Sequence, residues 1–160
     1  MMSLPRLGLA TGVLALQAVV VLPQRPPKFP SKIKAVTAKL YYSDSGTFSE
    51  NILDKPDLIL WNTIIGEGQS GGPSAATLVQ VEVDGDGAGN VIHKERLTIT
   101  IQQQGDPAIS RRTGPLFFGE NGKHFEAVWI LDSGCLPVTI SAHIDGQPAV
   151  HKKIDFQCGE

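Results

Sequence analysis

The sequence predicts an all-β fold, an antiparallel sandwich of two sheets with about seven strands. Apolar side chains recur at every second residue in several short segments, and turn-forming Gly, Pro and Asp residues separate these segments. No window shows the periodicity of a helix. The chain has 160 residues, of which 41% are hydrophobic and 19% charged, an ordinary composition for one globular domain.

Most of the predicted strands alternate between apolar and polar side chains, so each should bury one face. These alternating segments are residues 36–42, 79–83, 97–101 and 138–144. In the first of them, Tyr41 falls on the polar face. The runs at 58–65 and 125–131 are apolar on both faces, which predicts central strands. A last strand at 150–156 completes the set.

The N-terminal segment has the layout of a secretory signal peptide. Arg6 is its only charged side chain, and the apolar run at 7–22 is short for a membrane span. We therefore divide the chain into a signal peptide cleaved near 15–22, a proline-rich tether and a β-sandwich domain, at 1–22, 23–32 and 33–160. The domain should be secreted or periplasmic, and it should contact a membrane only through an uncleaved leader.

The only cysteines are Cys135 and Cys158, and an even count in an exported chain predicts a disulfide. The last hairpin supports this pairing. If its turn covers 145–149 and inward residues face each other, Ile144 lies opposite Val150. In that register Cys135 comes almost opposite Cys158, and the bond would join the open end of the hairpin.

The same register predicts that His143 and His151 face each other on the outer surface of the hairpin, with Asp145 two residues along. Two imidazoles and a carboxylate at this spacing can share a transition metal. A metal-binding protein or metalloenzyme is therefore one alternative function. Exposed histidines without a ligand are the simpler interpretation, and we expect no cofactor.

A loop is expected at 109–122, where Arg111 and Arg112 come close in sequence to Phe117 and Phe118. Arginine and aromatic residues together are typical of the side chains that dominate protein interfaces. The loop is thus the candidate contact surface if the chain is an inhibitor or an accessory subunit of a secreted protein. The other interpretation is that one or both Phe side chains close the core.

Two glycine-rich segments match part of a known motif without its context. Residues 66–74 contain the G-x-S-x-G pattern around Ser70, but every histidine lies after Ser70 and a strand rather than a helix follows. Residues 84–95 match part of an EF-hand loop, but Ala88 stands where Asp or Asn is needed. We predict that residues 66–74 are an inter-strand loop, that DGDGAGN at 84–90 is a turn joining two strands, and that the chain has no catalytic residues.

The segment VTISAHIDGQPAVHKKIDF, at 138–156, resembles the last hairpin of immunoglobulin-like domains, including bacterial ones. The resemblance covers roughly the last 35 residues and implies an Ig-like sandwich. The chain departs from antibody domains because both cysteines lie in its last quarter and it lacks a tyrosine corner. The resemblance therefore implies an architecture and no activity.

The formal net charge of −2 lacks the basic excess of a general nucleic-acid binder, so nucleic acid is not an expected partner. Without a catalytic constellation, we expect an exported, non-catalytic binding or structural module. Its partner would be a protein or a cell-surface polymer that the sequence does not identify.

Overall fold

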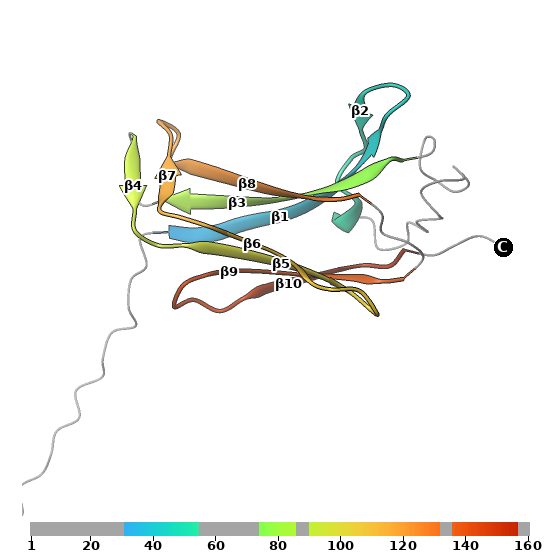
Figure 1. The fold of residues 1–160 in the computed structure, drawn as a ribbon. Helices are drawn as coiled ribbons and strands as arrows, with labels where there is room; N and C mark the ends of the chain where they lie inside the picture. Colours follow the sequence, from blue (N-terminus) through green and yellow to red (C-terminus); the bar gives the residue numbers. More distant parts are fainter. Residues whose placement is uncertain (1–30, 55–73, 86–89, 132–135, 157–160) are drawn as a thin grey trace, which may run out of the picture.

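The computed structural model describes residues 31–54, 74–85, 90–131 and 136–156. In these residues two four-stranded antiparallel sheets lie face to face, and a two-stranded ribbon crosses one end (Figure 1). The prediction of an all-β antiparallel fold is confirmed. A 3-10 turn at Ile52–Asp54 (η1) is the only helical element of the described residues. The predicted leader and the predicted strand at 58–65 lie outside them.

The first sheet has the strand order β2-β1-β3-β8, and every neighbouring pair is antiparallel. Its strands are β1 (Ser31–Tyr42), β2 (Thr47–Phe48), β3 (Ala76–Gly85) and β8 (Lys123–Ile130). Because β1 begins at Ser31, the last two residues of the tether expected at 23–32 belong to this sheet instead.

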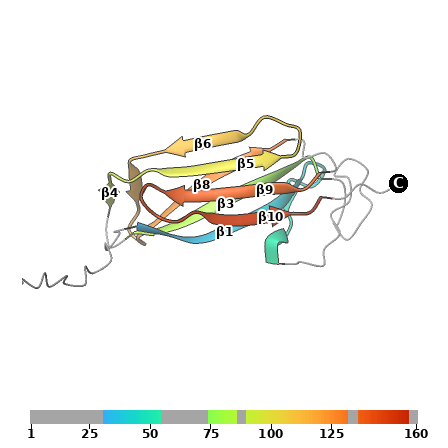
Figure 2. The same ribbon diagram turned by 90° about the horizontal axis from the view of Figure 1, so that it is seen from below.

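The second sheet has the order β10-β9-β5-β6 and is also antiparallel. Its strands are β5 (Leu97–Gln103), β6 (Ile109–Thr113), β9 (Val138–Ile144) and β10 (Val150–Ile154). The end ribbon pairs β4 (Val91–His93) with β7 (Leu116–Phe118). The chain changes sheet after β3, after β6 and after β8, so strands that follow one another often lie in different layers (Figure 2).

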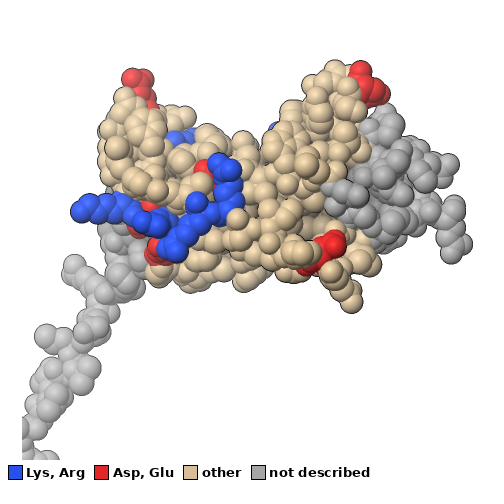
Figure 3. Space-filling model, viewed as in Figure 1, with Lys and Arg blue, Asp and Glu red and all other residues tan. Residues whose placement is uncertain are grey.

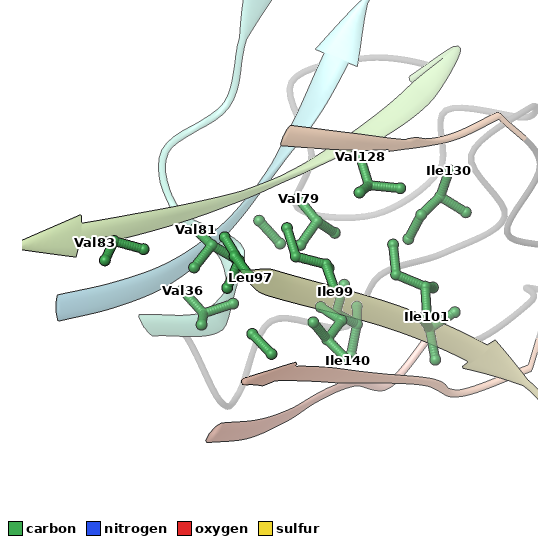
Figure 4. Packing of buried hydrophobic residues seen from close by; sticks show 14 of the residues in the cluster. Val36, Val79, Val81, Val83, Leu97, Ile99, Ile101, Val128, Ile130 and Ile140 are labelled. Atoms are coloured by element: carbon green, nitrogen blue, oxygen red, sulfur yellow. The ribbon is translucent and has the colours of Figure 1, made fainter. Parts of the chain in front are cut away.

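The core consists of alternate residues from the two facing sheets. The central strands β3 and β5 supply Val79, Val81, Val83, Leu97, Ile99 and Ile101, each at most 2% exposed (Figure 4). Complete burial of one such side chain stabilises the fold by about 1.5–3 kcal/mol before the entropy cost is subtracted. The alternation in the sequence therefore identified the inward faces of these strands correctly.

Strand β8 is at the edge of its sheet, so the central strand predicted from the apolar run at 125–131 is wrong. Its inward residues Val128 and Ile130 are buried, whereas Phe125 and Trp129 are 48% and 43% exposed. The run is apolar on both faces because large aromatic side chains occupy the outer face. Hydrophobicity alone does not tell such a face from one that another layer covers.

The last hairpin forms, but the predicted register is wrong by two residues. Val150 pairs with Ala142 and not with Ile144. Residues 143–149 lie between this pair instead of the expected 145–149, and they contain a tight turn in which the Gln147 amide donates to the Ile144 carbonyl over 2.9 Å and Gly146 has a φ of 80°. A slip of two residues keeps every inward side chain inward, so the period-two pattern cannot detect it.

Candidate functional site

The segment expected to be a loop at 109–122 instead forms strands β6 and β7 and a turn into β8. Phe118 is 1% exposed and closes the core, as the second interpretation of this segment expects, whereas Phe117 is 52% exposed. Arg111 and Arg112 are exposed residues of the edge strand β6. The structure therefore separates the four residues into one core side chain and three surface side chains.

Both arginines of β6 form ion pairs. The Arg111 guanidinium donates to the carboxylate of Glu126, a residue of β8, so this pair joins the edge strands of the two sheets. The Arg112 guanidinium donates to Asp145 over 2.9 Å. Each arginine side chain is 56% exposed, so each pair contributes about 1 kcal/mol at most. On the side of the molecule that Figure 3 shows, basic side chains gather toward the end with β4 and β7.

The structure does not bring the predicted metal ligands together. His151 pairs with Ser141 and not with His143, because the hairpin register differs from the predicted one. Asp145, the third predicted ligand, is bound to Arg112. Among the described residues, no group of three or more His, Cys, Asp or Glu side chains is arranged to hold a metal ion. The prediction that these two imidazoles face each other directly, on which the metal hypothesis rested, is therefore wrong.

Several other sequence predictions concern residues outside the described ranges. These residues are Cys135, Cys158, Ser70 and Ala88. The disulfide and the two inter-strand loops therefore stay predictions.

One end of the sandwich is closed by a stack of rings around Phe118. The ring of His93 lies 4.6 Å from that of Phe118, and the ring of His124 lies 6.0 Å from it. The Nδ1 atom of His93 is 2.8 Å from the Ser31 hydroxyl, and that of His124 is 2.9 Å from the Phe117 carbonyl oxygen. These contacts attach the β4–β7 ribbon to the sheets, which is a structural role.

Three aromatic side chains that the sequence analysis did not single out form a cluster on the outer face of the first sheet. The ring centroids of Tyr41 and Phe48 are 5.2 Å apart, and those of Phe48 and Trp129 are 6.0 Å apart. Tyr41 and Trp129 meet edge to face over 5.8 Å. Each such pair contributes about 0.5–1.5 kcal/mol beyond the area it buries.

The β1–β2 hairpin places Phe48 in this cluster. The amide of Gly46 donates to the Tyr42 carbonyl over 2.8 Å, and Gly46 has a φ of 68° that favours glycine. The chain then turns back so that Phe48 pairs with Tyr41 in the sheet. Phe48 and Trp129 keep 44% and 43% of their surface exposed, which leaves a large apolar area in contact with water.

The surface beside the cluster is hollowed. The β1–β2 hairpin and the β4–β7 ribbon rise at opposite ends of the first sheet, and the surface dips between them (Figures 1 and 3). Phe125 shares the outer face of β8 with Trp129 and is also exposed. We call Tyr41, Phe48, Phe125 and Trp129 the aromatic saddle.

An ion pair lies at the ribbon end of the aromatic saddle. The Lys123 ammonium donates to the Glu82 carboxylate, which is on the strand next to β8. This hydrogen bond and the charge of the carboxylate raise the pKa of Lys123. The saddle therefore has an apolar end at the hairpin and a charged end at the ribbon.

The sequence contains part of the pattern that indicates the aromatic saddle. Tyr41 lies on the polar face of its strand, and Phe125 and Trp129 share one parity in the run at 125–131. Phe48 could not be found in this way, because its place depends on how the hairpin folds back.

No helix of the described residues is long and apolar enough to cross a bilayer. The chain matches no model of a known protein family, and comparison with curated proteins finds no significant match.

Proposed function

We propose that this chain is an exported, non-catalytic binding module of Ig-like type, and that it binds a protein partner through the aromatic saddle. The observation that carries the proposal is the exposed cluster of Tyr41, Phe48 and Trp129. Tyrosine and tryptophan are enriched among the residues that dominate binding free energy at protein interfaces. They bury a large area and lose little conformational entropy when they do so.

The Ig-like part of the proposal is supported by the strand order. In immunoglobulin domains, strands A, B and E share one sheet, and strands G, F and C share the other, with C′ added beside C in variable domains. Here β1-β3-β8 has the order of A-B-E, and β10-β9-β5-β6 has the order of G-F-C-C′. Such domains serve many functions, so the order supports the architecture alone.

Export is supported by the sequence. The apolar run at 7–22 and the proline-rich tether after it have the layout of a signal peptide and a spacer. The module would then act in the periplasm or outside the cell.

A protein partner fits the apolar end of the saddle. Trp129 lies opposite Leu78 of β3, and Ala127 is the next residue of β8 on the same face. Polar side chains lie beside them, since Gln80 is opposite Ala127 and Lys39 is opposite Leu78. A protein could pack an apolar projection on the aromatic and aliphatic side chains and place polar groups against Gln80 and Lys39.

The proposal can be tested by affinity capture with the mature protein and an envelope extract of the source cells. One variant combines Phe48→Ser with Trp129→Ser. Ile109→Ser is the matched control, since Ile109 is an equally exposed apolar residue of β6, away from the saddle. We expect wild type and control to enrich the same few proteins, and the saddle variant to enrich them at least about tenfold less.

Equal enrichment by the saddle variant would contradict the proposal. So would sedimentation of the wild-type protein with insoluble cell-wall polymer in place of any protein, because the polymer would then be the partner.

A further inference from the structure

A second candidate site lies along the side of the sandwich where β1 of the first sheet is next to β10 of the second sheet. The Arg111–Glu126 pair joins the sheets along the opposite side, between β6 and β8. A cleft of about 360 Å³ separates the strands there. Its lining includes Lys34, Val36 and Thr37 of β1, Asn51 beside η1, and Val150 and Lys152 of β10.

Side chains take the place of a neighbouring strand along part of the β1 edge. The Ala38 amide donates to the Asn51 side-chain oxygen over 2.8 Å, and the Leu40 amide donates to the Ser49 hydroxyl over 2.9 Å. The Leu40 carbonyl accepts from the Ser49 amide over 2.9 Å. The backbone groups of Ala38 and Leu40 that bond in this way therefore face away from β3.

The backbone of Val36 faces the same edge, because the N–H and C=O groups of every second residue point to one side of a strand. The hydrogen bonds that Ser49 and Asn51 make to this edge reach no further along β1 than Ala38. No described residue hydrogen-bonds the Val36 backbone on that edge. Val36 also lines the cleft. With respect to the described residues, the edge thus presents one donor and one acceptor without a partner at the cleft.

Two lysine side chains, Lys34 and Lys152, add positive charge to the lining of the cleft. The register of β1 against β3 shifts between Ile33 and Ala35, so Lys34 is the extra residue of a β-bulge. Lys34 and Lys152 are both exposed, and neither has an acidic partner in the described residues. Of the described residues that line the cleft, Asp54 alone is acidic.

We propose that this cleft binds an extended, acidic segment of a partner protein, which adds as a strand to the edge of β1. The backbone of that segment would pair with Val36, and its apolar side chains would pack on Val36 and Val150. Its carboxylates would meet Lys34 and Lys152. A second copy of this chain is a poor occupant, because two β1 edges would bring lysine against lysine. This site does not depend on the aromatic saddle, which lies on the outer face of the sheet.

The test uses a short fluorescein-labelled peptide of alternating valine and glutamate, titrated with the mature protein and followed by fluorescence anisotropy. Two matched peptides serve as controls. One replaces glutamate with lysine, and the other keeps the side chains but carries N-methyl groups that remove the amide donors of one edge. We expect both controls to bind at least about tenfold more weakly than the acidic peptide.

Charge reversal in the protein locates the site. Lys34→Glu and Lys152→Glu should each weaken binding of the acidic peptide at least about fivefold, because each puts a like charge beside a glutamate. Lys94→Glu is the control, since Lys94 is exposed between β4 and β5 and should change the affinity by less than about twofold. All three side chains are on the surface, so the variants should fold.

Three results would overturn the proposal. They are the absence of binding by the wild type, equal binding of the N-methylated peptide, and an equal loss in Lys94→Glu and Lys34→Glu.

Discussion

The indole ring of Trp129 stands edge-on to the phenol ring of Tyr41, with 5.8 Å between the centroids and 78° between the planes. The two residues come from β8 and β1, which are not neighbours, because β3 lies between them. The rings therefore meet across the middle strand of the sheet and cover part of its outer face. Much of both Trp129 and Phe48 is still in water, and a partner would bury this remaining area.

The contact between Tyr41 and Trp129 should stabilise the fold measurably. We expect a double-mutant cycle of Tyr41→Ala and Trp129→Ala to give a coupling free energy of about 0.5–1.5 kcal/mol. Urea unfolding of the four proteins measures it. Strictly additive effects would mean that the rings contribute only through the area that each buries separately.

Ile99 has no solvent exposure and lies in the middle of the core. Ile99→Ala should lower the free energy of unfolding by about 2–5 kcal/mol, because it removes buried methyl groups and leaves a cavity. Thr100→Ala, on the other face of β5, should lower it by less than about 0.5 kcal/mol. Similar losses at the two positions in chemical unfolding would show that the inward face of β5 has been assigned wrongly.

Gly85 is in close contact with the buried ring of Phe118. A Cβ atom at this position would lie 2.8 Å from a carbon of that ring, so Gly85→Ala requires the ring and the β4–β7 ribbon to move. We expect a loss of about 1–3 kcal/mol in stability. The control is Gly119→Ala, where the nearest atom would be 3.6 Å away, and thermal unfolding should show little change for it. A neutral Gly85→Ala would contradict the packing described for the ribbon.

The ion pair of Lys123 and Glu82 should make stability depend on alkaline pH. The carboxylate raises the pKa of Lys123 above 10.5, so the folded state holds this proton more tightly than the unfolded state does. The pair therefore stabilises the fold at pH values below the ordinary lysine pKa, and the effect is lost as the pH rises through the raised pKa.

Urea titrations of wild type and Glu82→Gln at neutral pH and at about pH 11.5 test this dependence. The wild type should be the more stable at neutral pH, by a small margin because Lys123 is exposed, and the margin should shrink at the higher pH. A margin that is equal at both pH values would mean that the pair does not act through the charge of Lys123.

The inward faces of β1, β3, β5 and β9 could be predicted because burial on one side of a strand imposes a period of two on the sequence. The same period explains an error, since it left the hairpin register open to a slip of two residues. The ribbon strands Val91–His93 and Leu116–Phe118 were missed because three residues are too few to show a pattern.

The surface sites depend on relations that the sequence does not display. The aromatic saddle needs β8 at an edge, β1 two strands away and a hairpin that returns Phe48 to Tyr41. The cleft between β1 and β10 needs a bulge at Lys34 and the side-chain bonds of Ser49 and Asn51. Each relation is set by pairing between segments far apart in the chain.

Site-specific photo-crosslinking in the source cells tests the central claim most directly. A benzoylphenylalanine residue is placed at position 48, within the aromatic saddle, or at position 109 on β6 as the control. The binding-module proposal predicts a discrete protein adduct from position 48 and none from position 109, and the adduct should disappear when Trp129→Ser is added. No adduct from position 48, or the same adduct from both positions, would contradict it.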